Sequence, residues 1–272
     1  MSGARTTFAV PAPWDIGQFS HRASMNNPYA VAIVGAASGI GRAAAEYLAS
    51  AGCAVACLDR DGEGAASCAA GIAASGGRAS SHVVDIGDPK AAEAALAAAE
   101  SALGPLHAAV NCAGITGRTN VKAQEVDLAD FDAVYRVNLR AALVFSQAVL
   151  PRFLARDYGR LLHVASIAGK DGNAGMTAYS ATKAGLIGLV KSMGKDYAAT
   201  GITVNALAPA VVRTPMVDAL PQATVDYMTS KIPMGRCGEL LEVAAMIAWI
   251  VSPACSFTTG FTFDLTGGRA TY

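Results

Sequence analysis

The sequence lacks an excess of charge of either sign. Its 272 residues include 21 basic and 21 acidic side chains, so the formal net charge is zero. Proteins that bind nucleic acid usually carry a basic excess or a basic stripe, and neither is visible here. Charged residues make up only 15% of the chain and hydrophobic residues 53%, which argues against intrinsic disorder. The sequence therefore predicts a folded protein without a nucleic-acid partner.

The sequence also lacks the cysteine spacings of metal and redox sites. None of its six cysteines belongs to a C-x-x-C pair, and no histidine stands near them at zinc-ligand spacing. We therefore expect no metal site, and we expect reduced, buried thiols of the kind found in cytoplasmic proteins. The six are Cys53, Cys57, Cys68, Cys112, Cys237 and Cys255.

An uninterrupted apolar run of membrane-spanning length is missing. Residues 243–263 carry no formal charge, but Ser252, Pro253 and Gly260 interrupt them. A core helix, a turn and a buried strand explain this stretch better than a membrane span. Residues 1–28 contain three prolines and no apolar run long enough for a secretory signal. We predict an N-terminal extension over 1–28, without an assigned role, and no membrane contact.

From residue 29 onward, short apolar runs alternate with longer helical patterns rich in alanine, leucine and lysine. The runs are apolar on successive residues, as in strands that are covered on both faces of a parallel sheet. No linker follows residue 29, so we expect one domain over 29–272. The pattern predicts an α/β fold with a single doubly wound parallel sheet of the Rossmann type, with about seven strands and helices on both faces. The predicted strands are 30–35, 54–59, 81–85, 106–111, 160–166, 202–208 and 261–264, and the predicted helices are 40–51, 61–75, 89–103, 128–155, 177–200 and 239–252.

A glycine-rich turn separates the first predicted strand from the first helix. Its spacing is G-x-x-x-G-x-G over residues 35–41. Glycines allow a tight turn and let backbone N–H groups approach a pyrophosphate at a helix end whose dipole favours anions. Its place between a strand and a helix predicts a dinucleotide site. The expected contacts are Gly35, Ser38, Gly39, Ile40 and Gly41.

Asp59 ends the second predicted strand, 18 residues after Gly41. A carboxylate there can accept hydrogen bonds from the adenosine ribose hydroxyls and would repel a 2′-phosphate. The glycine turn holds no basic residue before Gly41, although Arg60 follows Asp59. The sequence therefore favours NAD as the cofactor over NADP.

Tyr179 and Lys183 are four residues apart on a predicted helix, so their side chains share one face. Ser166 lies 13 residues earlier, at the end of the fifth predicted strand. A phenol is a poor base at neutral pH, but a nearby ammonium favours the phenolate and lowers its pKa by about one to three units. A hydroxyl beside the phenol can hold a substrate oxygen in the same geometry. We therefore predict an acid/base centre at Tyr179.

These motifs together resemble the short-chain dehydrogenase/reductase family of the single-domain type. The resemblance extends from about residue 29 to the end and includes the glycine turn, Asn-Cys-Ala-Gly at 111–114, Asn138, Ser166, and the Tyr179–Lys183 pair. It implies that Tyr179 is the general acid/base, that Lys183 lowers its pKa and binds the nicotinamide ribose, that Ser166 binds the substrate oxygen, and that Asn138 holds a water that relays protons to Lys183. It implies further cofactor contacts at Asp85, Asn111, Ala113, Gly114, Pro209, Val212 and Thr214, and a homotetramer or homodimer packed through the helices at 128–155 and 177–200.

The substrate is a small molecule whose class the sequence narrows only in part. Residues 166–182 and the last nine residues are similar to bacterial relatives that act on sugars or deoxy-sugar acids, and to 3-oxoacyl reductases. We favour a secondary alcohol of a polyol, sugar or sugar acid. A 3-oxoacyl-thioester reductase and a non-catalytic dinucleotide-binding regulator stay open as alternatives.

A polar segment follows Ser166: Lys170, Asp171 and Asn173 form either a polar pocket wall or a solvated loop. The terminal residues 269–272 are expected to reach a neighbouring subunit.

Overall fold

The computed structural model describes residues 28–218 and 222–272. The predicted N-terminal extension over 1–28 therefore lies outside the described residues, except for Pro28. Within the described chain, no helix combines the length and the apolarity that a bilayer crossing requires. The uncharged stretch 243–263 is divided between a helix, a turn and a strand, as predicted.

Seven strands form one sheet in the order β3-β2-β1-β4-β5-β6-β9. All six pairings are parallel, and the order reverses direction between β1 and β4. This arrangement confirms the predicted Rossmann-type fold, in which ligands bind beyond the carboxyl ends of the strands near the reversal point. The strands are β1 (Ala30–Val34), β2 (Ala54–Asp59), β3 (Arg78–Val83), β4 (Leu106–Asn111), β5 (Gly159–Val164), β6 (Ile202–Pro209) and β9 (Thr262–Leu265).

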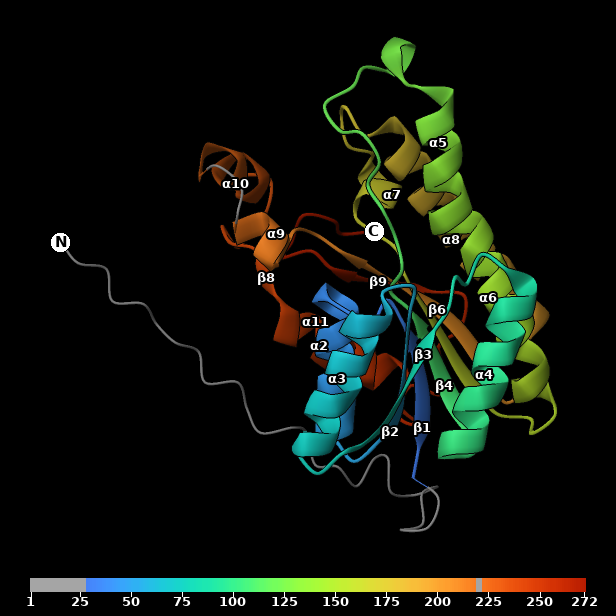
Figure 1. Cartoon of the computed structure of the whole chain (residues 1–272). Helices are drawn as coiled ribbons and strands as arrows, with labels where there is room; N and C mark the ends of the chain where they lie inside the picture. Colours follow the sequence, from blue (N-terminus) through green and yellow to red (C-terminus); the bar gives the residue numbers. More distant parts are fainter. Residues whose placement is uncertain (1–27, 219–221) are drawn as a thin grey trace.

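Helices cover both faces of the sheet (Figure 1). One face carries α2 (Gly39–Ser50), α3 (Gly62–Ala74) and α11 (Leu240–Ile250), and the other carries α4 (Pro89–Leu103), α6 (Ala141–Leu154) and α8 (Thr177–Asp196). Local sequence sets several of the ends. Asp61 and Asp88 accept hydrogen bonds from the first free N–H groups of α3 and α4, and Pro89 starts α4 where no N–H is needed.

Short elements lie near the carboxyl edge of the sheet, where the chain leaves the strands. They are η1 (Ala123–Glu125), α5 (Leu128–Tyr135), α7 (Ala168–Asp171), α9 (Pro215–Asp218), α10 (Gln222–Thr229) and the two-stranded pair β7 (Val212–Arg213) and β8 (Gly238–Glu239). The sequence had predicted none of these except α5, because runs of two to eight residues carry too little periodicity to be recognised.

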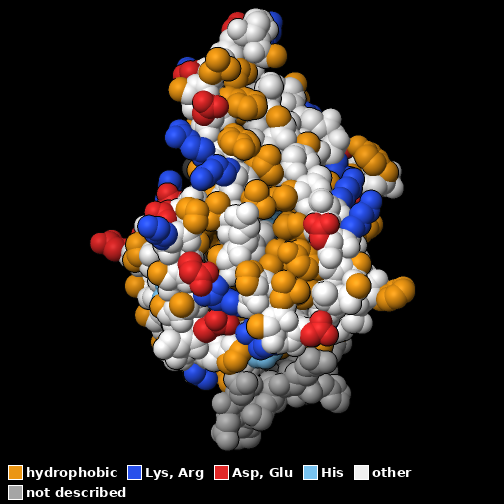
Figure 2. Space-filling view, turned by 90° about the vertical axis from the view of Figure 1, so that its right-hand side faces the viewer, with side chains coloured by type: hydrophobic (Ala, Val, Ile, Leu, Met, Phe, Trp, Pro, Cys, Tyr) orange, Lys and Arg blue, Asp and Glu red, His pale blue; other side chains and the backbone are white. Residues whose placement is uncertain are grey.

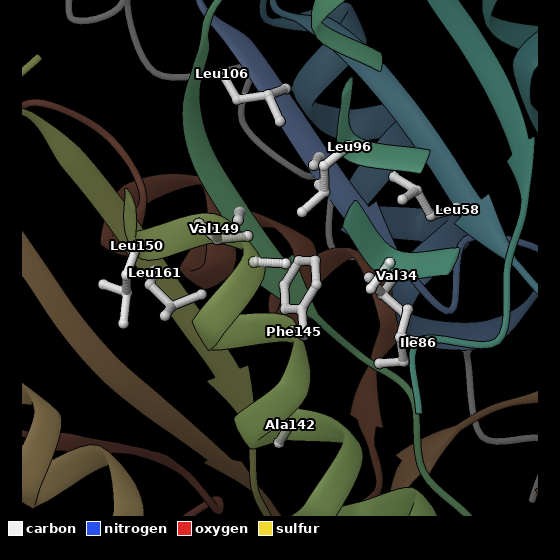
Figure 3. Packing of buried hydrophobic residues seen from close by; sticks show 14 of the residues in the cluster. Val34, Leu58, Ile86, Leu96, Leu106, Ala142, Phe145, Val149, Leu150 and Leu161 are labelled. Atoms are coloured by element: carbon white, nitrogen blue, oxygen red, sulfur yellow. The ribbon is translucent and has the colours of Figure 1, made fainter. Parts of the chain in front are cut away.

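The core has one layer on each face of the sheet. Figure 3 shows Phe145 of α6 among Val34, Ile86 and Val149, and all four side chains are nearly inaccessible to solvent. Burying each such side chain stabilises the fold by about 1.5–3 kcal/mol relative to leaving it exposed. Every residue of β1 and β5 is buried, which is why these strands lack polar alternation in the sequence.

The predicted continuous helix over 128–155 was wrong. The structure has α5, then a π-helical turn η2 (Arg136–Arg140), then α6. A π turn inserts a residue into the helical repeat and re-aims the side chains that it carries. Asn138 lies within it. Sequence periodicity does not reveal such a turn, because its hydrogen bonds depend on what the helix packs against.

Candidate active site

A cavity of about 240 Å³ opens where β1, β4, β5 and β6 end. Its walls come from the segments that follow these strands and from the first turns of α2 and α8. Among the residues that the structure describes, no cluster of His, Cys, Asp and Glu side chains fits a metal ion. The lining residues are Ile40, Cys112, Gly114, Ile115, Thr116, Val164, Ala165, Ser166, Tyr179, Lys183, Pro209, Ala210, Val212 and Thr214.

Three of the four predicted catalytic residues line this cavity. Ser166 lies two residues beyond β5, Tyr179 is the third residue of α8, and Lys183 follows one turn later. The Ser166 hydroxyl accepts a hydrogen bond of 3.1 Å from the Ala168 N–H, which fixes the direction of its side chain. Ser166 and Tyr179, 13 positions apart in the sequence, thus come together because the end of β5 and the start of α8 border the same cavity.

Lys183 is buried, with 3% of its surface exposed, and its ammonium donates a hydrogen bond of 2.7 Å to the Val164 carbonyl. The nitrogen lies 5.8 Å from the centre of the Tyr179 ring. Burial lowers the pKa of Lys183 to about 8. An ammonium with this pKa can exchange a proton near neutral pH.

The pKa of Tyr179 differs from the sequence-based expectation. Burial raises it above its ordinary value, and a hydrogen bond with Ser166 acts in the opposite direction. The expected lowering by Lys183 was therefore wrong for the protein in this structure. Burial destabilises a phenolate, and the Lys183 ammonium is engaged by Val164 rather than by the phenol.

Asn138, the fourth predicted residue, is 1% exposed and lies beside the cavity. Its side-chain oxygen accepts from the Ile115 N–H at 2.8 Å, and its amide group donates to the Ile115 carbonyl at 2.9 Å. A Cβ added to Gly114 would come within 3.3 Å of the Lys183 nitrogen and 3.4 Å of the Asn138 oxygen. Asn138 and Lys183 therefore flank the same glycine.

The glycine turn has the backbone that its sequence predicts. Gly35 and Gly39 have φ angles of 81° and 53°, which favour glycine. A Cβ on Gly41 would lie 2.1 Å from the Gly35 carbonyl oxygen, so only glycine fits there. The exposed Ser38 precedes α2 without capping it through its side chain, and the first N–H groups of the helix are free to meet an anion. This cradle fits a dinucleotide pyrophosphate.

Asp59 and Asp85 lie at the neighbouring strand ends. One Asp59 oxygen accepts from the Ala37 N–H and the other from the Asp61 N–H, both at 3.0 Å. Asp59 therefore also holds the glycine turn, a role that sequence reasoning missed. Asp85 is exposed just beyond β3 and accepts from the Gly87 N–H at 2.8 Å.

The segment after β4 forms the wall of the cavity beside the glycine turn. Asn111 is buried and its side-chain oxygen accepts from the Ala113 N–H at 3.1 Å, which makes a tight turn. The Cys112 N–H donates to the Val34 carbonyl at 2.9 Å. Burial raises the pKa of the Cys112 thiol to about 12, so it stays protonated at neutral pH. Ile115 and Thr116 continue the wall. Their position directly after a buried strand was the signal that could have identified them.

The polar loop after Ser166 is fastened to the end of its own chain. The Lys170 ammonium pairs with Asp264 at 2.7 Å and contacts the Tyr272 main-chain oxygen. Arg269 donates to Asp171 at 3.3 Å and to Asn173 at 2.7 Å. The Lys170 charge is therefore compensated within the protein, which argues against a free substrate-binding cation at this position. Within the chain, Arg269 and Tyr272 of the terminal segment contact this loop.

Comparisons with known proteins agree with this geometry. A family model described as short chain dehydrogenase matches residues 29–224. The chain is 44% identical over 242 residues, covering 88% of it and 94% of the relative, to 2-dehydro-3-deoxy-L-rhamnonate dehydrogenase (NAD(+)) of Sphingomonas sp. (strain SKA58). It is 34% identical to a 3-oxoacyl-(acyl-carrier-protein) reductase of Haemophilus influenzae, with 87% of this chain and 96% of that one covered.

A solved structure of a dehydrogenase/reductase from Sinorhizobium meliloti 1021 superposes with a TM-score of 0.82 at 32% identity. The match covers 90% of this chain and 96% of that one. These similarities cover most of the chain. They agree with the order of the seven strands, the glycine turn, and the cavity that Ser166, Tyr179 and Lys183 line. This protein belongs to the short-chain dehydrogenase/reductase family of oxidoreductases, which act on CH–OH groups.

Proposed function

We propose that this protein uses NAD to interconvert a secondary alcohol and a ketone in a polyol, sugar or sugar acid. The observation that carries the proposal is that Ser166, Tyr179 and Lys183 line one cavity together with Ile40 of the glycine turn. The sugar-acid preference is supported by the relative that is 44% identical and is named as an NAD(+) dehydrogenase of a deoxy-sugar acid.

The preference for NAD is supported by Asp59. A carboxylate has about four lone-pair positions, and the Ala37 and Asp61 N–H groups occupy two of them. The others remain for ribose hydroxyls, whereas a 2′-phosphate would face a like charge. In this proposal Gly35, Ser38 and the first turn of α2 bind the pyrophosphate.

Further residues would hold the rest of the cofactor. Asp85 would contact the adenine, and the turn at 111–114 would form the wall behind the nicotinamide ribose. On the opposite side the carboxamide would meet Pro209, Val212 and Thr214, which line the cavity at the end of β6 and just beyond it.

In the proposed reaction, a bound nicotinamide supplies the acceptor for the hydride that leaves the substrate carbon. Ser166 donates a hydrogen bond to the substrate oxygen and holds it next to the Tyr179 phenol. In oxidation Tyr179 takes the hydroxyl proton as the C–O bond becomes a carbonyl, and in reduction it returns that proton. Because burial raises the Tyr179 pKa, the phenol of this structure keeps its proton at neutral pH, which is the protonation state that the reduction direction requires.

Lys183 and Asn138 would connect Tyr179 to solvent. Lys183, with a pKa of about 8, can release a proton near neutral pH, and Asn138 is held rigidly by Ile115 on the other side of Gly114. We propose that Lys183 exchanges this proton with solvent through a water that Asn138 helps to hold.

The proposed assembly is a homodimer or homotetramer. Figure 2 shows hydrophobic side chains gathered on the side of the molecule where α4, α5 and α6 lie. Leu128, Tyr135, Leu143 and Leu154, which are 40–76% exposed, belong to α5 and α6. Covering such side chains with a second copy would remove apolar surface from water. A solution mass at the monomer value, measured by light scattering, would contradict this assembly.

The function is tested with a panel of polyols, sugar acids and 3-hydroxyacyl thioesters, each with NAD and NADP, by following the absorbance of the reduced cofactor. We expect the highest kcat/KM for a sugar acid or polyol with NAD. A preference for thioesters with NADP would favour a 3-oxoacyl reductase. Cofactor binding without turnover anywhere in the panel would favour a regulator.

The acid/base assignment is tested with Tyr179→Phe. Turnover should fall by about 10²–10⁴-fold, which is the usual contribution of a positioned acid/base, while NADH affinity stays within about threefold. Tyr197→Phe, at the end of the same helix, serves as the control and should retain activity. Equal rates for Tyr179→Phe and the wild type would show that another group moves the proton.

A further inference from the structure

A chain of buried polar side chains leads from α6 to the wall of the cavity. His163 of β5 is 0% exposed, and in the sheet it is the direct neighbour of Asn111 on β4. Its Nδ1 lies 3.3 Å from the Asn111 amide nitrogen, and its Nε2 lies 3.0 Å from the Ser146 hydroxyl. The predicted catalytic set does not include His163, and it lies too deep to contact substrate.

The hydrogen-bond partners determine where the protons are. Ser146 donates its single hydroxyl proton to the Ala142 carbonyl at 2.8 Å, so it must accept from His163 Nε2–H. The Asn111 amide nitrogen can only donate, so His163 Nδ1 must be its acceptor. His163 is therefore the neutral Nε2–H tautomer. Burial and the Lys183 charge lower its pKa to about 3, in agreement with this neutral form.

The orientation of the Asn111 amide depends on this tautomer. With its nitrogen directed at His163 Nδ1, Asn111 presents its oxygen to the Ala113 N–H, at 3.1 Å. Without an acceptor at the His163 position, the buried amide nitrogen would be unpaired, which is costly, and a rotated amide would lose the Ala113 bond. Asn111 thus needs an acceptor on one side to support the turn on the other.

That turn lies directly against the cofactor cradle. A Cβ on Gly35 would come 3.1 Å from the Ala113 nitrogen, and Cys112 and Gly114 line the cavity. A small shift of the turn would therefore narrow the space above Gly35 or move Gly114 against Lys183.

We propose that His163 is a positioning residue: as an Nε2–H imidazole it fixes the Asn111 amide, and through it the 112–114 turn that borders the dinucleotide. The inference rests on the proposed function in one respect, that NAD(H) occupies this cavity. It assigns no chemical step to His163.

Substitution of His163 by Asn and by Gln tests whether Asn111 needs a hydrogen-bond acceptor at the Nδ1 position or only a polar side chain. Asn places its side-chain oxygen near the position of Nδ1, whereas Gln places its polar group near Nε2. NADH affinity is measured by fluorescence titration, which needs no knowledge of the substrate. We expect His163→Gln and His163→Leu to weaken NADH binding by about tenfold, and His163→Asn to stay within about twofold of the wild type. At saturating cofactor, kcat should change less than about twofold in all three.

Ser146→Ala is the matched control, because it removes the Nε2–H acceptor and leaves the bond between Asn111 and His163 Nδ1 intact. It should lower the thermal midpoint without changing NADH affinity. A merely structural role for His163 would make NADH affinity follow thermal stability across all four variants, which would overturn the proposal. Equal affinity for His163→Leu and His163→Asn would also overturn it.

The wild-type protein offers a test that does not depend on variants folding. The chain has four histidines, so ¹⁵N-histidine labelling gives a small set of imidazole signals. We expect one neutral Nε2–H imidazole near pH 7 that disappears from the spectrum of His163→Asn. An Nδ1–H or doubly protonated form at this residue would refute the proposal. Failure of the wild type to bind NADH would instead refute the proposed function, because the tautomer is measured without cofactor.

Discussion

The buried ammonium of Lys183 should make the stability of the cofactor-free protein depend on pH. Its pKa falls from an ordinary 10.5 to about 8 on folding, because burial penalises the charged form. Between these two values the unfolded chain holds a proton that the folded protein has released. Stability therefore rises with pH in this window and is lowest below the folded pKa, where the ammonium is charged in both states.

The magnitude follows from the shift. Each pKa unit corresponds to about 1.4 kcal/mol, so the whole shift corresponds to about 3 kcal/mol. Integrated over the titration, the free energy of unfolding should gain about 2 kcal/mol from Lys183 alone between about pH 7 and about pH 9.5. Replacement by Met keeps the length of the side chain and removes the titration.

The assay is urea unfolding of the wild type, Lys183→Met and the exposed control Lys191→Met at several pH values. Burial raises the pKa of Cys53 and of Cys112 to about 12, which lowers stability at alkaline pH in all three proteins. The difference between proteins is therefore the informative quantity. Wild type and Lys191→Met should gain about 2 kcal/mol relative to Lys183→Met over this window. Parallel curves for all three would refute the reasoning.

Three further predictions concern the cavity and its supports. Asp59→Asn should reduce the ratio of kcat/KM with NAD to that with NADP by at least about tenfold, since it removes the charge that opposes a 2′-phosphate; an unchanged ratio would show that another residue sets the preference. Gly41→Ala should abolish NADH binding in a fluorescence titration, because its Cβ would lie 2.1 Å from the Gly35 oxygen, and normal affinity would contradict the cradle. Arg269→Ala should raise the KM for substrate several-fold and leave NADH affinity unchanged. The reason is that Asp171 and Asn173, in the segment that joins Ser166 to Tyr179, lose the hydrogen bonds that hold them. Loss of NADH affinity would contradict a role for this segment in substrate binding alone.

Local sequence determined the sheet and most of the cavity. Continuous apolar runs predict strands that are buried on both faces, and β2 and β4 occupy the predicted residues 54–59 and 106–111. The glycine turn is equally local, since the conformations of Gly35 and Gly39 are open to few other residues. The spacing of Tyr179 and Lys183 places them on one helix face wherever that helix packs.

Tertiary structure decided what depends on burial and on contacts between distant segments. Burial raises the Tyr179 pKa, whereas the sequence alone predicted a lowering by Lys183. The compensation of Lys170 by Asp264 joins residues 94 positions apart. His163 matters through Asn111 and Ser146, which come from a neighbouring strand and a helix. A sequence states which groups are present and their local spacing, but desolvation and hydrogen-bond partners exist only once the chain has packed.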